Sequence, residues 1–293
     1  MHAGEHAVTA ARARALIAAQ MPDLADLPLR RVGQTGTDNV LDRLGPALVA
    51  RFPRLPWGAA EVLHLARWLP TLTPLPLSIP LATRLGQPDA AYPHPWSIGP
   101  WLPGRDAFTA PPDQRTAVPI LAQFLKTLHN HPRRPDAPLR GQADRFDLRL
   151  TAARPLIAQL TPAEGDADLL LHLLTRAQAT PPFAGTPVWI HGDLHPANLL
   201  TRRGRLTSVI DWGGMGLGDP GMDLMVAWTL LDAQARAAFK AAMEPDPAAW
   251  ARGRAQALGK ALQAIPYYRH TNPEFHRQMC QTLARVAADP DAA

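Results

Sequence analysis

The sequence is poor in cysteine and lysine. It has one cysteine, Cys280, and three of its 30 basic residues are lysine. A single cysteine excludes an intramolecular disulfide and a zinc site built from thiolates of one chain. No uninterrupted apolar run reaches the roughly 18 residues that a membrane-spanning helix needs. Charged residues interrupt the apolar part of residues 1–20, which therefore lack the apolar core of a signal peptide. A cytoplasmic protein with no membrane partner is expected.

The sequence also lacks a cluster of charge. The formal net charge is +5, but the arginines are scattered as single residues and as pairs such as Arg30-Arg31 and Arg133-Arg134. A nucleic-acid-binding protein usually gathers its basic residues into a stripe, so no nucleic-acid partner is expected. Hydrophobic residues make up 46% and charged residues 19% of the 293 positions. These values favour a packed globular protein with one large or two modest domains.

The predicted elements change in kind along the chain. Short strands are predicted over 29–33, 39–45, 47–53, 77–85 and 96–102, with helices over 8–20 and 59–69. Beyond proline-rich segments, helices are predicted over 113–129, 144–160, 163–179, 221–243, 248–264 and 273–288. The fold class is therefore α+β. Residues 1–102 form a predicted β-rich N-terminal domain and residues 103–293 a mainly helical C-terminal domain.

A group of polar residues precedes a predicted β-hairpin inside the helical part. The stretch HGDLHPANLL spans residues 191–200, and the hairpin strands are predicted over 198–201 and 206–210, with the turn at Arg203-Gly204. Paired strands lie about 5 Å apart, so Asn198 and Asp211 can reach one ion, with Asp193 nearby. Oxygen ligands of this kind suit Mg²⁺. Two metal ligands and one further carboxylate, which orients an acceptor hydroxyl, are typical of a phosphoryl-transfer site.

These motifs resemble those of protein kinases and, more closely, of the aminoglycoside phosphotransferase family. The interval from Asp193 to Asn198 matches the kinase catalytic loop, and Asp211-Trp212-Gly213 follows where a kinase has its metal-binding D-F-G. The family signature H-G-D-x-H-x-x-N, I-D-W/F and G-D-P-x-x-D-L matches residues 191–198, 210–212 and 218–224 in the same order. The resemblance covers nearly the whole chain. It implies a protein-kinase-like two-lobe fold and transfer of the γ-phosphate of ATP or GTP to a hydroxyl of a small molecule.

Roles for individual residues follow from the resemblance. Asp193 matches the catalytic base, and Asn198 and Asp211 match the magnesium ligands. Nucleotide contacts are implied for Arg51 on the third strand, for a hinge near Ser97 and Ile98, and more weakly for the turn glycines Gly33 and Gly36. The residues that match supporting positions around the catalytic loop are His191, His195, Asp219 and Asp223.

One position departs from the kinase pattern. Kinases pair the cation of the third strand with a helix glutamate, but the corresponding position here is near the apolar Leu65. Glu61 lies one turn earlier on a similar face of the predicted helix and can substitute. We therefore predict an ion pair between Arg51 and Glu61.

Alternative interpretations remain open. His191 and His195 can be structural residues of the loop. A metallophosphatase shares Asp-x-His with this loop, but its later Gly-Asn-His motif is absent. A non-catalytic nucleotide-binding regulatory module on the same fold is the main alternative function. The acceptor is not defined either: the family's substrates include antibiotics, such as aminoglycosides and macrolides, and metabolites such as homoserine or choline. Because acidic residues are scattered in the C-terminal domain, antibiotic resistance is only one of the possible roles. The oligomeric state is not predicted.

Overall fold

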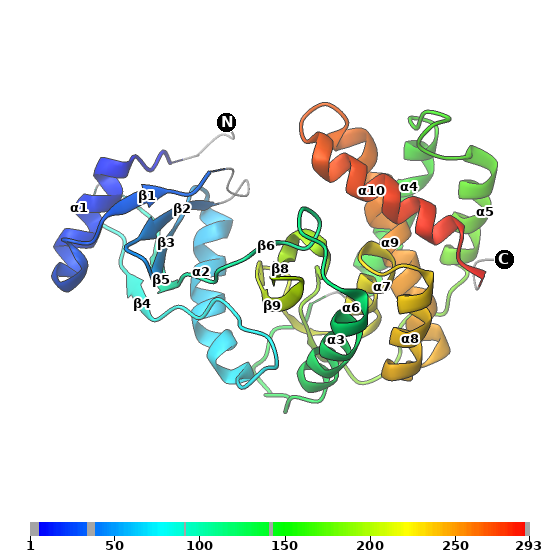
Figure 1. The fold of residues 1–293 in the computed structure, drawn as a ribbon, viewed down its shortest axis with the longest axis horizontal. Helices are drawn as coiled ribbons and strands as arrows, with labels where there is room; N and C mark the ends of the chain where they lie inside the picture. Colours follow the sequence, from blue (N-terminus) through cyan, green and yellow to red (C-terminus); the bar gives the residue numbers. More distant parts are fainter. Residues whose placement is uncertain (1–5, 34–38, 91, 141–142, 291–293) are drawn as a thin grey trace. The chain divides into compact units, whose positions relative to one another are not determined.

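The computed structural model describes residues 6–33, 39–90, 92–140 and 143–290, without the side chains of 143–149 (Figure 1). The chain divides into two compact units. The first, called here the sheet unit, comprises residues 1–74 and 78–103. The second, called the helical unit, comprises residues 75–77 and 104–293. Each unit is described separately.

The sheet unit contains a five-stranded antiparallel sheet in the order β1-β2-β3-β5-β4. Its strands are β1 (Leu29–Arg31), β2 (Asn39–Leu44), β3 (Leu48–Pro53), β4 (Arg84–Gly86) and β5 (Trp96–Pro100), and its helices are α1 (Ala10–Gln20) and α2 (Pro56–Trp68). Gly45 turns the chain between β2 and β3 with φ of 59°, which glycine adopts readily. The buried rings of Phe52 and Trp96 stack with centroids 5.0 Å apart and form the centre of the core.

The predicted strand over 77–85 is largely wrong. Only Arg84–Gly86 pairs with β5, and most of the segment runs without ladder hydrogen bonds. Pro76 and Pro80 lack the N–H group that a ladder requires, so this apolar run stays outside the sheet.

Gly86, at the end of β4, must be glycine for a steric reason. A Cβ at this position would lie 1.8 Å from Cε2 of Trp96, so only glycine allows the strand to pass the indole ring.

The helical unit is built from helices around one long central helix, α9. Its helices are α3 (Gln114–His129), α4 (Ala143–Ile157), α5 (Ala167–Gln178), α6 (Gly221–Leu224), α7 (Val226–Thr229), α8 (Ala233–Met243), α9 (Pro247–Tyr268) and α10 (Pro273–Ala287). Its strands are β6 (Arg105–Asp106), β7 (Val188–Ile190), β8 (Leu199–Arg202), β9 (Arg205–Val209) and β10 (Gly216–Gly218). They form one sheet in the order β6-β8-β9 and a second sheet of β10 and β7.

The single helix predicted over 221–243 is wrong. The segment forms three helices, α6, α7 and α8, with a break before α8. The side chain of Asp232 caps the new helix by accepting a hydrogen bond from Ala235 N at 2.8 Å. An aspartate favours this capping position over a helix interior, because its carboxylate satisfies an N–H that the first turn leaves unpaired. Periodicity alone does not reveal such a break.

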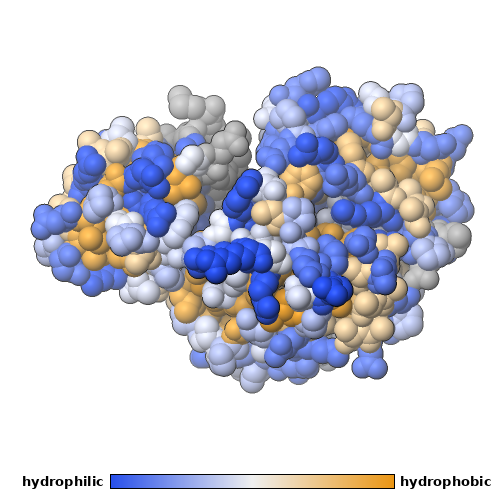
Figure 2. Space-filling model, in the orientation of Figure 1, coloured by the Kyte–Doolittle hydropathy of each residue, from blue (hydrophilic) through white to orange (hydrophobic). Residues whose placement is uncertain are grey.

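The surface drawn in Figure 2 mixes hydrophilic and hydrophobic residues over both units, so hydrophobic patches on that face are interrupted. Within the described part of the chain, we find no helix with the length and apolar character needed to cross a membrane. Four large apolar side chains, those of Trp96, Trp189, Trp212 and Trp228, are fully buried.

A buried carboxylate joins the loop before α5 to the last two helices. Glu164 accepts hydrogen bonds from Arg269, at 2.9 Å from Nε and 2.7 Å from Nη2, and its Oε1 lies 2.8 Å from His276 Nε2. The side chain of Glu164 is only 8% exposed. The hydrogen bonds from Arg269 hold the pKa of Glu164 well below its usual range, against the opposing effect of burial.

Replacing Glu164 with glutamine is expected to lower the free energy of unfolding by about 2 kcal/mol at neutral pH, the usual value of hydrogen bonds to a charged group. The pKa of Glu164 is depressed in the folded state, so this stabilisation is present above the unfolded-state pKa of about 4.3. It is lost as pH falls toward the folded-state pKa. The difference between wild type and variant should therefore narrow below about pH 4.3.

Urea unfolding across this pH range measures both quantities. The matched control is Glu274→Gln, because the Glu274 side chain is 53% exposed on α10 and should contribute little. A Glu164→Gln difference that is as large at low pH as at neutral pH would contradict this account of the pair.

Candidate active site

The loop from β7 to β8 is held in place by the carboxylate of Asp223. Its Oδ2 accepts a hydrogen bond from His191 N at 3.0 Å, and its Oδ1 accepts one from Gly192 N at 2.8 Å. Gly192 has φ of 82°, and a Cβ there would lie 2.5 Å from Gly214 O. Only glycine suits this position, which explains the residue between His191 and Asp193. Asp223 also lies 3.1 Å from His129 Nε2, so it links the loop to α3.

His191 is buried and hydrogen-bonds on both ring nitrogens. Its Nδ1 accepts from Asp193 N at 3.2 Å, which leaves Nε2 to donate to Ile210 O at 3.0 Å. The imidazole also packs edge-on against Trp212, with ring centroids 4.8 Å apart. His191 thus connects the residue before Asp211 to the loop that carries Asp193.

Asp193 projects from this loop with a side chain that is 39% exposed. Its Oδ1 lies 2.5 Å from Lys260 Nζ, and its Oδ2 lies 3.5 Å from His195 Nε2. Burial alone would raise the pKa of Asp193, but the charge of Lys260 and the contacts with His195 hold that pKa well below its usual range. The carboxylate is therefore ionised at neutral pH, as an acceptor for a hydroxyl proton must be.

His195 is a buried neighbour of Asp193. Burial and the charge of Lys260 lower the pKa of His195, so its ring is neutral at physiological pH. Its Nε2 lies 3.3 Å from Asn198 Nδ2, and its buried Nδ1 has no hydrogen-bond partner in the described residues. Its ring also contacts Phe275 at 5.6 Å between centroids.

Asn198 and Asp211 lie at the two ends of the β8-β9 hairpin. Asn198 O accepts a hydrogen bond from Ile210 N at 2.9 Å, which closes the open end of the hairpin beside Asp211. Asn198 Nδ2 donates to Asp193 O at 2.9 Å, so the amide group is fixed. Asp211 has φ of 61°, an unusual value for a residue with a side chain, and strain of this kind concentrates at functional sites.

The two hairpin residues fit a magnesium ion by their chemistry. The Asp211 carboxylate is exposed and forms no hydrogen bond or ion pair with the described part of the chain. The Asn198 amide, anchored through its nitrogen, keeps its oxygen as a possible ligand. A carboxylate and an amide oxygen, completed by water and phosphate oxygens, are the ligands that Mg²⁺ prefers.

Asp219 performs a structural function. Its Oδ2 lies 2.6 Å from Arg252 Nε and its Oδ1 lies 3.1 Å from Arg252 Nη2, and both side chains are buried. Oδ1 also accepts a hydrogen bond from Gly221 N at 2.9 Å. This bidentate pair fixes the start of α6 to α9, the helix that also carries Lys260.

The sheet unit contains the ion pair between Arg51 and Glu61. Arg51 Nη2 lies 2.5 Å from Glu61 Oε1, while the apolar Leu65 is buried. Arg51 is also opposite Ser97 in the β3-β5 ladder. Ile98 follows Ser97, and its carbonyl oxygen already accepts hydrogen bonds from Thr83 N at 2.8 Å and from Thr83 Oγ1 at 3.1 Å.

Of the two turn glycines, Gly33 belongs to the residues that the structure describes. Among the described residues, no atom lies within 4 Å of the position that a Cβ of Gly33 would take. Gly36 lies outside the described residues.

Lys260 is the site residue that the sequence did not indicate. It is 67 positions from Asp193, and it is an isolated lysine within a helix whose other features point to packing. Tyr268, at the end of the same helix, is also close: burial, Tyr267 and the charge of Asp193 raise its pKa. Its ring contacts Phe275 at 4.9 Å between centroids.

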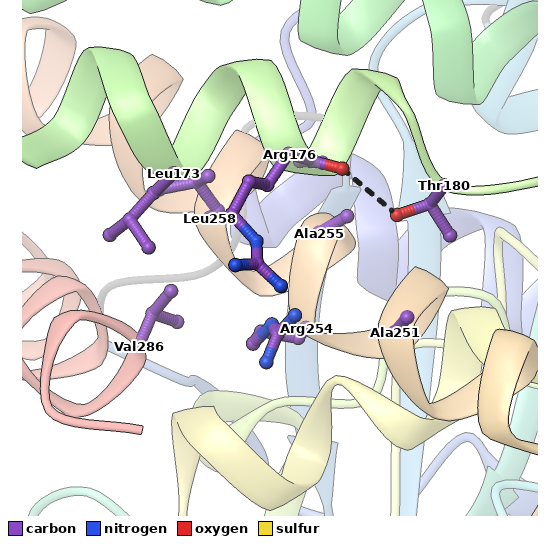
Figure 3. A pocket seen from close by; sticks show the side chains of 9 residues that line it. Leu173, Arg176, Thr180, Ala251, Arg254, Ala255, Leu258 and Val286 are labelled. Atoms are coloured by element: carbon purple, nitrogen blue, oxygen red, sulfur yellow. Dashed lines mark hydrogen bonds between the residues drawn. The ribbon is translucent and has the colours of Figure 1, made fainter. Parts of the chain in front are cut away.

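A separate pocket lies among α5, α9 and α10 (Figure 3). At the edge of this pocket, Thr180 Oγ1 donates a hydrogen bond to Arg176 O at 3.3 Å. The pocket is lined by none of the residues predicted as site residues, so the pocket is distinct from the candidate active site. Its lining residues are Leu173, Arg176, Ala177, Thr180, Ala251, Arg254, Ala255, Leu258 and Val286.

Several solved structures share this fold. The GDP complex of wild-type aminoglycoside 2′-phosphotransferase-IIIa is 20% identical, with a TM-score of 0.73 over 96% of this chain and 99% of that one. Spectinomycin phosphotransferase with ADP and spectinomycin is 10% identical, with a TM-score of 0.68 over 98% and 100% of the two chains. Macrolide 2′-phosphotransferase type I is 20% identical, with a TM-score of 0.61 over 97% and 99%. The protein-kinase-like α+β fold expected from the motifs is thereby confirmed.

The sequence comparisons address the family directly. No curated protein matches the chain. The model of the phosphotransferase enzyme family, abbreviated APH, matches residues 30–259. That range contains the loop, the hairpin and the Gly-Asp-Pro motif, and it extends over most of both units. The chain belongs to the phosphotransferase enzyme family.

Proposed function

We propose that this protein transfers the γ-phosphate of ATP or GTP to a hydroxyl group of a small molecule. The observation that supports the proposal best is the arrangement around one hairpin. Asp193 is ionised and partly exposed, Asn198 is anchored to its backbone, and Asp211 holds a carboxylate without a partner among the described residues. Related structures were determined with GDP, ADP and ATP, which supports a nucleotide as the phosphate donor.

In this proposal, Asn198 and Asp211 would hold Mg²⁺. When bound, the metal neutralises the charge on the nucleotide phosphates. Asp193 does not belong to this ligand set. Its carboxylate accepts a hydrogen bond from the acceptor hydroxyl and aims that oxygen at the γ-phosphorus. As the new P–O bond forms, the bond to the β-phosphate oxygen breaks, the diphosphate leaves, and the hydroxyl proton passes to Asp193.

Residues of the sheet unit would contribute to nucleotide binding. Arg51, held by Glu61 at 2.5 Å, would contact phosphate oxygens. The turn containing Gly33 and Gly36 would approach the phosphates, and backbone groups of the hinge near Ser97 and Ile98 would contact the base. His191, His195, Asp219 and Asp223 would keep the loop in place. Because ATP and GTP are cytoplasmic substrates, we also propose that the protein works in the cytoplasm.

The main alternative is a non-catalytic nucleotide-binding module. Its chief support in the sequence is the apolar Leu65 in place of a helix glutamate. The ion pair of Arg51 with Glu61 supplies the missing partner, which weakens this objection to catalysis. Nucleotide binding without turnover would favour the alternative.

Asp211→Asn is expected to weaken magnesium-dependent nucleotide binding by roughly tenfold or more, because an amide is a poorer ligand for Mg²⁺ than a carboxylate. Calorimetry with ATP and GTP, each with and without magnesium, measures the effect. Asp168→Asn is the matched control, since Asp168 is exposed on α5. If Asp211→Asn binds magnesium nucleotide as tightly as wild type does, Asp211 is not a ligand.

A further inference from the structure

Lys260 lies where an acceptor must bind if the proposed function is right. We propose that Lys260 selects an acceptor that carries a carboxylate or phosphate group near its reacting hydroxyl. This inference rests on the proposed function and concerns only its substrate class. It involves residues of the helical unit alone.

The first support is the position of the lysine. Lys260 Nζ is 2.5 Å from Asp193 Oδ1, and its side chain is 17% exposed. A hydroxyl that reacts at Asp193 must lie about 3 Å from that carboxylate. An anionic group attached one or two carbons from the hydroxyl would then be within reach of the ammonium group. Contact between them would form a charge-assisted hydrogen bond.

The second support is the local balance of charge. Lys260 already neutralises Asp193, so the pair presents no surplus negative charge to an amine. A cationic acceptor would place a second positive charge beside Lys260, which is unfavourable in a partly buried site. The negative group of an anionic acceptor would pair with Lys260 in place of Asp193. Asp193 Oδ1 would then be available to the acceptor hydroxyl.

The third support comes from the other carboxylates around α9 and α10. Glu164 binds Arg269 and His276, Asp219 binds Arg252, and Asp289 binds Arg236 and Trp228. Among the side chains that the structure describes, these buried acids are all used internally. A polycationic acceptor could recruit them only by breaking buried ion pairs, which is costly.

An aromatic contact completes the surroundings. Phe275 touches both the His195 ring and the Tyr268 ring. His195 Nε2 lies 3.5 Å from Asp193 Oδ2, and the charge of Asp193 acts on Tyr268. Such rings favour the carbon skeleton of a compact hydroxyl compound. The expected acceptor is therefore a hydroxy acid or a phosphorylated polyol rather than a polyamine.

The experiment compares matched acceptors on two carbon skeletons. The glucose set is glucose, glucuronate, glucose 6-phosphate and glucosamine; the glycerol set is glycerol, glycerate, glycerol 3-phosphate and serinol. Release of the nucleoside diphosphate is measured for each with magnesium and ATP or GTP. Within a set the charge near the hydroxyls changes, while the skeleton stays similar. The carboxylate and phosphate members distinguish the two sources of negative charge.

Wild type should favour an anionic member over its neutral counterpart by roughly tenfold to a hundredfold in kcat/KM, the range for a hydrogen bond to a charged group. Lys260→Gln should lose most of this preference through a higher KM. Lys260→Arg should retain most of it, because the charge is kept. Lys126→Gln, an exposed lysine on α3, is the control and should match wild type.

Other outcomes overturn the inference. A preference for glucosamine or serinol, an anionic preference that persists in Lys260→Gln, or transfer to neutral members with none to any anionic member would each contradict it. Failure of the proposed function itself is recognised separately. In that case the protein would bind no magnesium nucleotide, or it would bind one and release no diphosphate with any acceptor, including water.

Discussion

Replacing Asp193 with asparagine is expected to lower kcat by about 10²–10⁴-fold, the usual contribution of a general base. The amide has nearly the same size as the carboxylate, but it is a poor base and cannot take the hydroxyl proton. The side chain is 39% exposed, and an asparagine oxygen can still accept a hydrogen bond from Lys260 Nζ. Folding and nucleotide affinity should therefore remain close to those of wild type.

The measurement pairs kcat, for any accepted hydroxyl substrate, with calorimetric nucleotide affinity and the urea midpoint of unfolding. Asp211→Asn serves as a contrast, because it should weaken magnesium and nucleotide binding as well as turnover. If Asp193→Asn kept a kcat near that of wild type, Asp193 would not be the base. If it lost nucleotide affinity as well, its role would be binding rather than proton transfer.

Replacing Arg252 with methionine is expected to lower the free energy of unfolding by about 3–5 kcal/mol, the cost of leaving a buried charge unpaired. Arg252 contacts Asp219 through two nitrogens, and both side chains are less than a tenth exposed. Methionine fills a similar space without a charge. The loss of stability therefore measures the cost of leaving the buried Asp219 carboxylate unpaired, and not the cost of a cavity. Activity should fall with stability, because the pair fixes α9, which carries Lys260.

Chemical unfolding of wild type and three variants tests this prediction. Asp219→Asn combined with Arg252→Met should recover part of the loss, because the stranded charge is removed. Arg115→Met is the control: its side chain is 92% exposed and 3.6 Å from Asp113, so its removal should cost less than about 1 kcal/mol. A loss below about 1 kcal/mol for Arg252→Met would show that the pair contributes no more than a surface contact.

Local signals in the sequence predicted much of the loop and hairpin. The turn at Arg203-Gly204 is correct, and both residues have positive φ, of 52° and 73°. Such a turn depends on the two residues themselves, so a short motif is enough to identify it. The spacing that put Glu61 one turn before Leu65 likewise indicated a contact with Arg51, and the structure contains that ion pair.

Features that depend on distant parts of the chain escaped prediction. The contact of Lys260 with Asp193 spans 67 residues and arises only when α9 packs in the helical unit. The break between α7 and α8 is set by the Asp232 cap, which competes with a continuous apolar pattern. The unpaired segment before β4 follows from prolines, whose effect on the ladder the apolar pattern does not show.

Acceptor-dependent phosphate transfer tests the central claim most directly. Phosphorus NMR would follow purified protein with magnesium, ATP or GTP and a panel of hydroxyl compounds of each charge. The account predicts a new phosphomonoester signal from at least one acceptor, with a matching amount of nucleoside diphosphate, and both signals should appear about 10²–10⁴-fold more slowly with Asp193→Asn. Nucleotide that binds with magnesium but yields no phosphomonoester from any acceptor would contradict the account and favour a non-catalytic module.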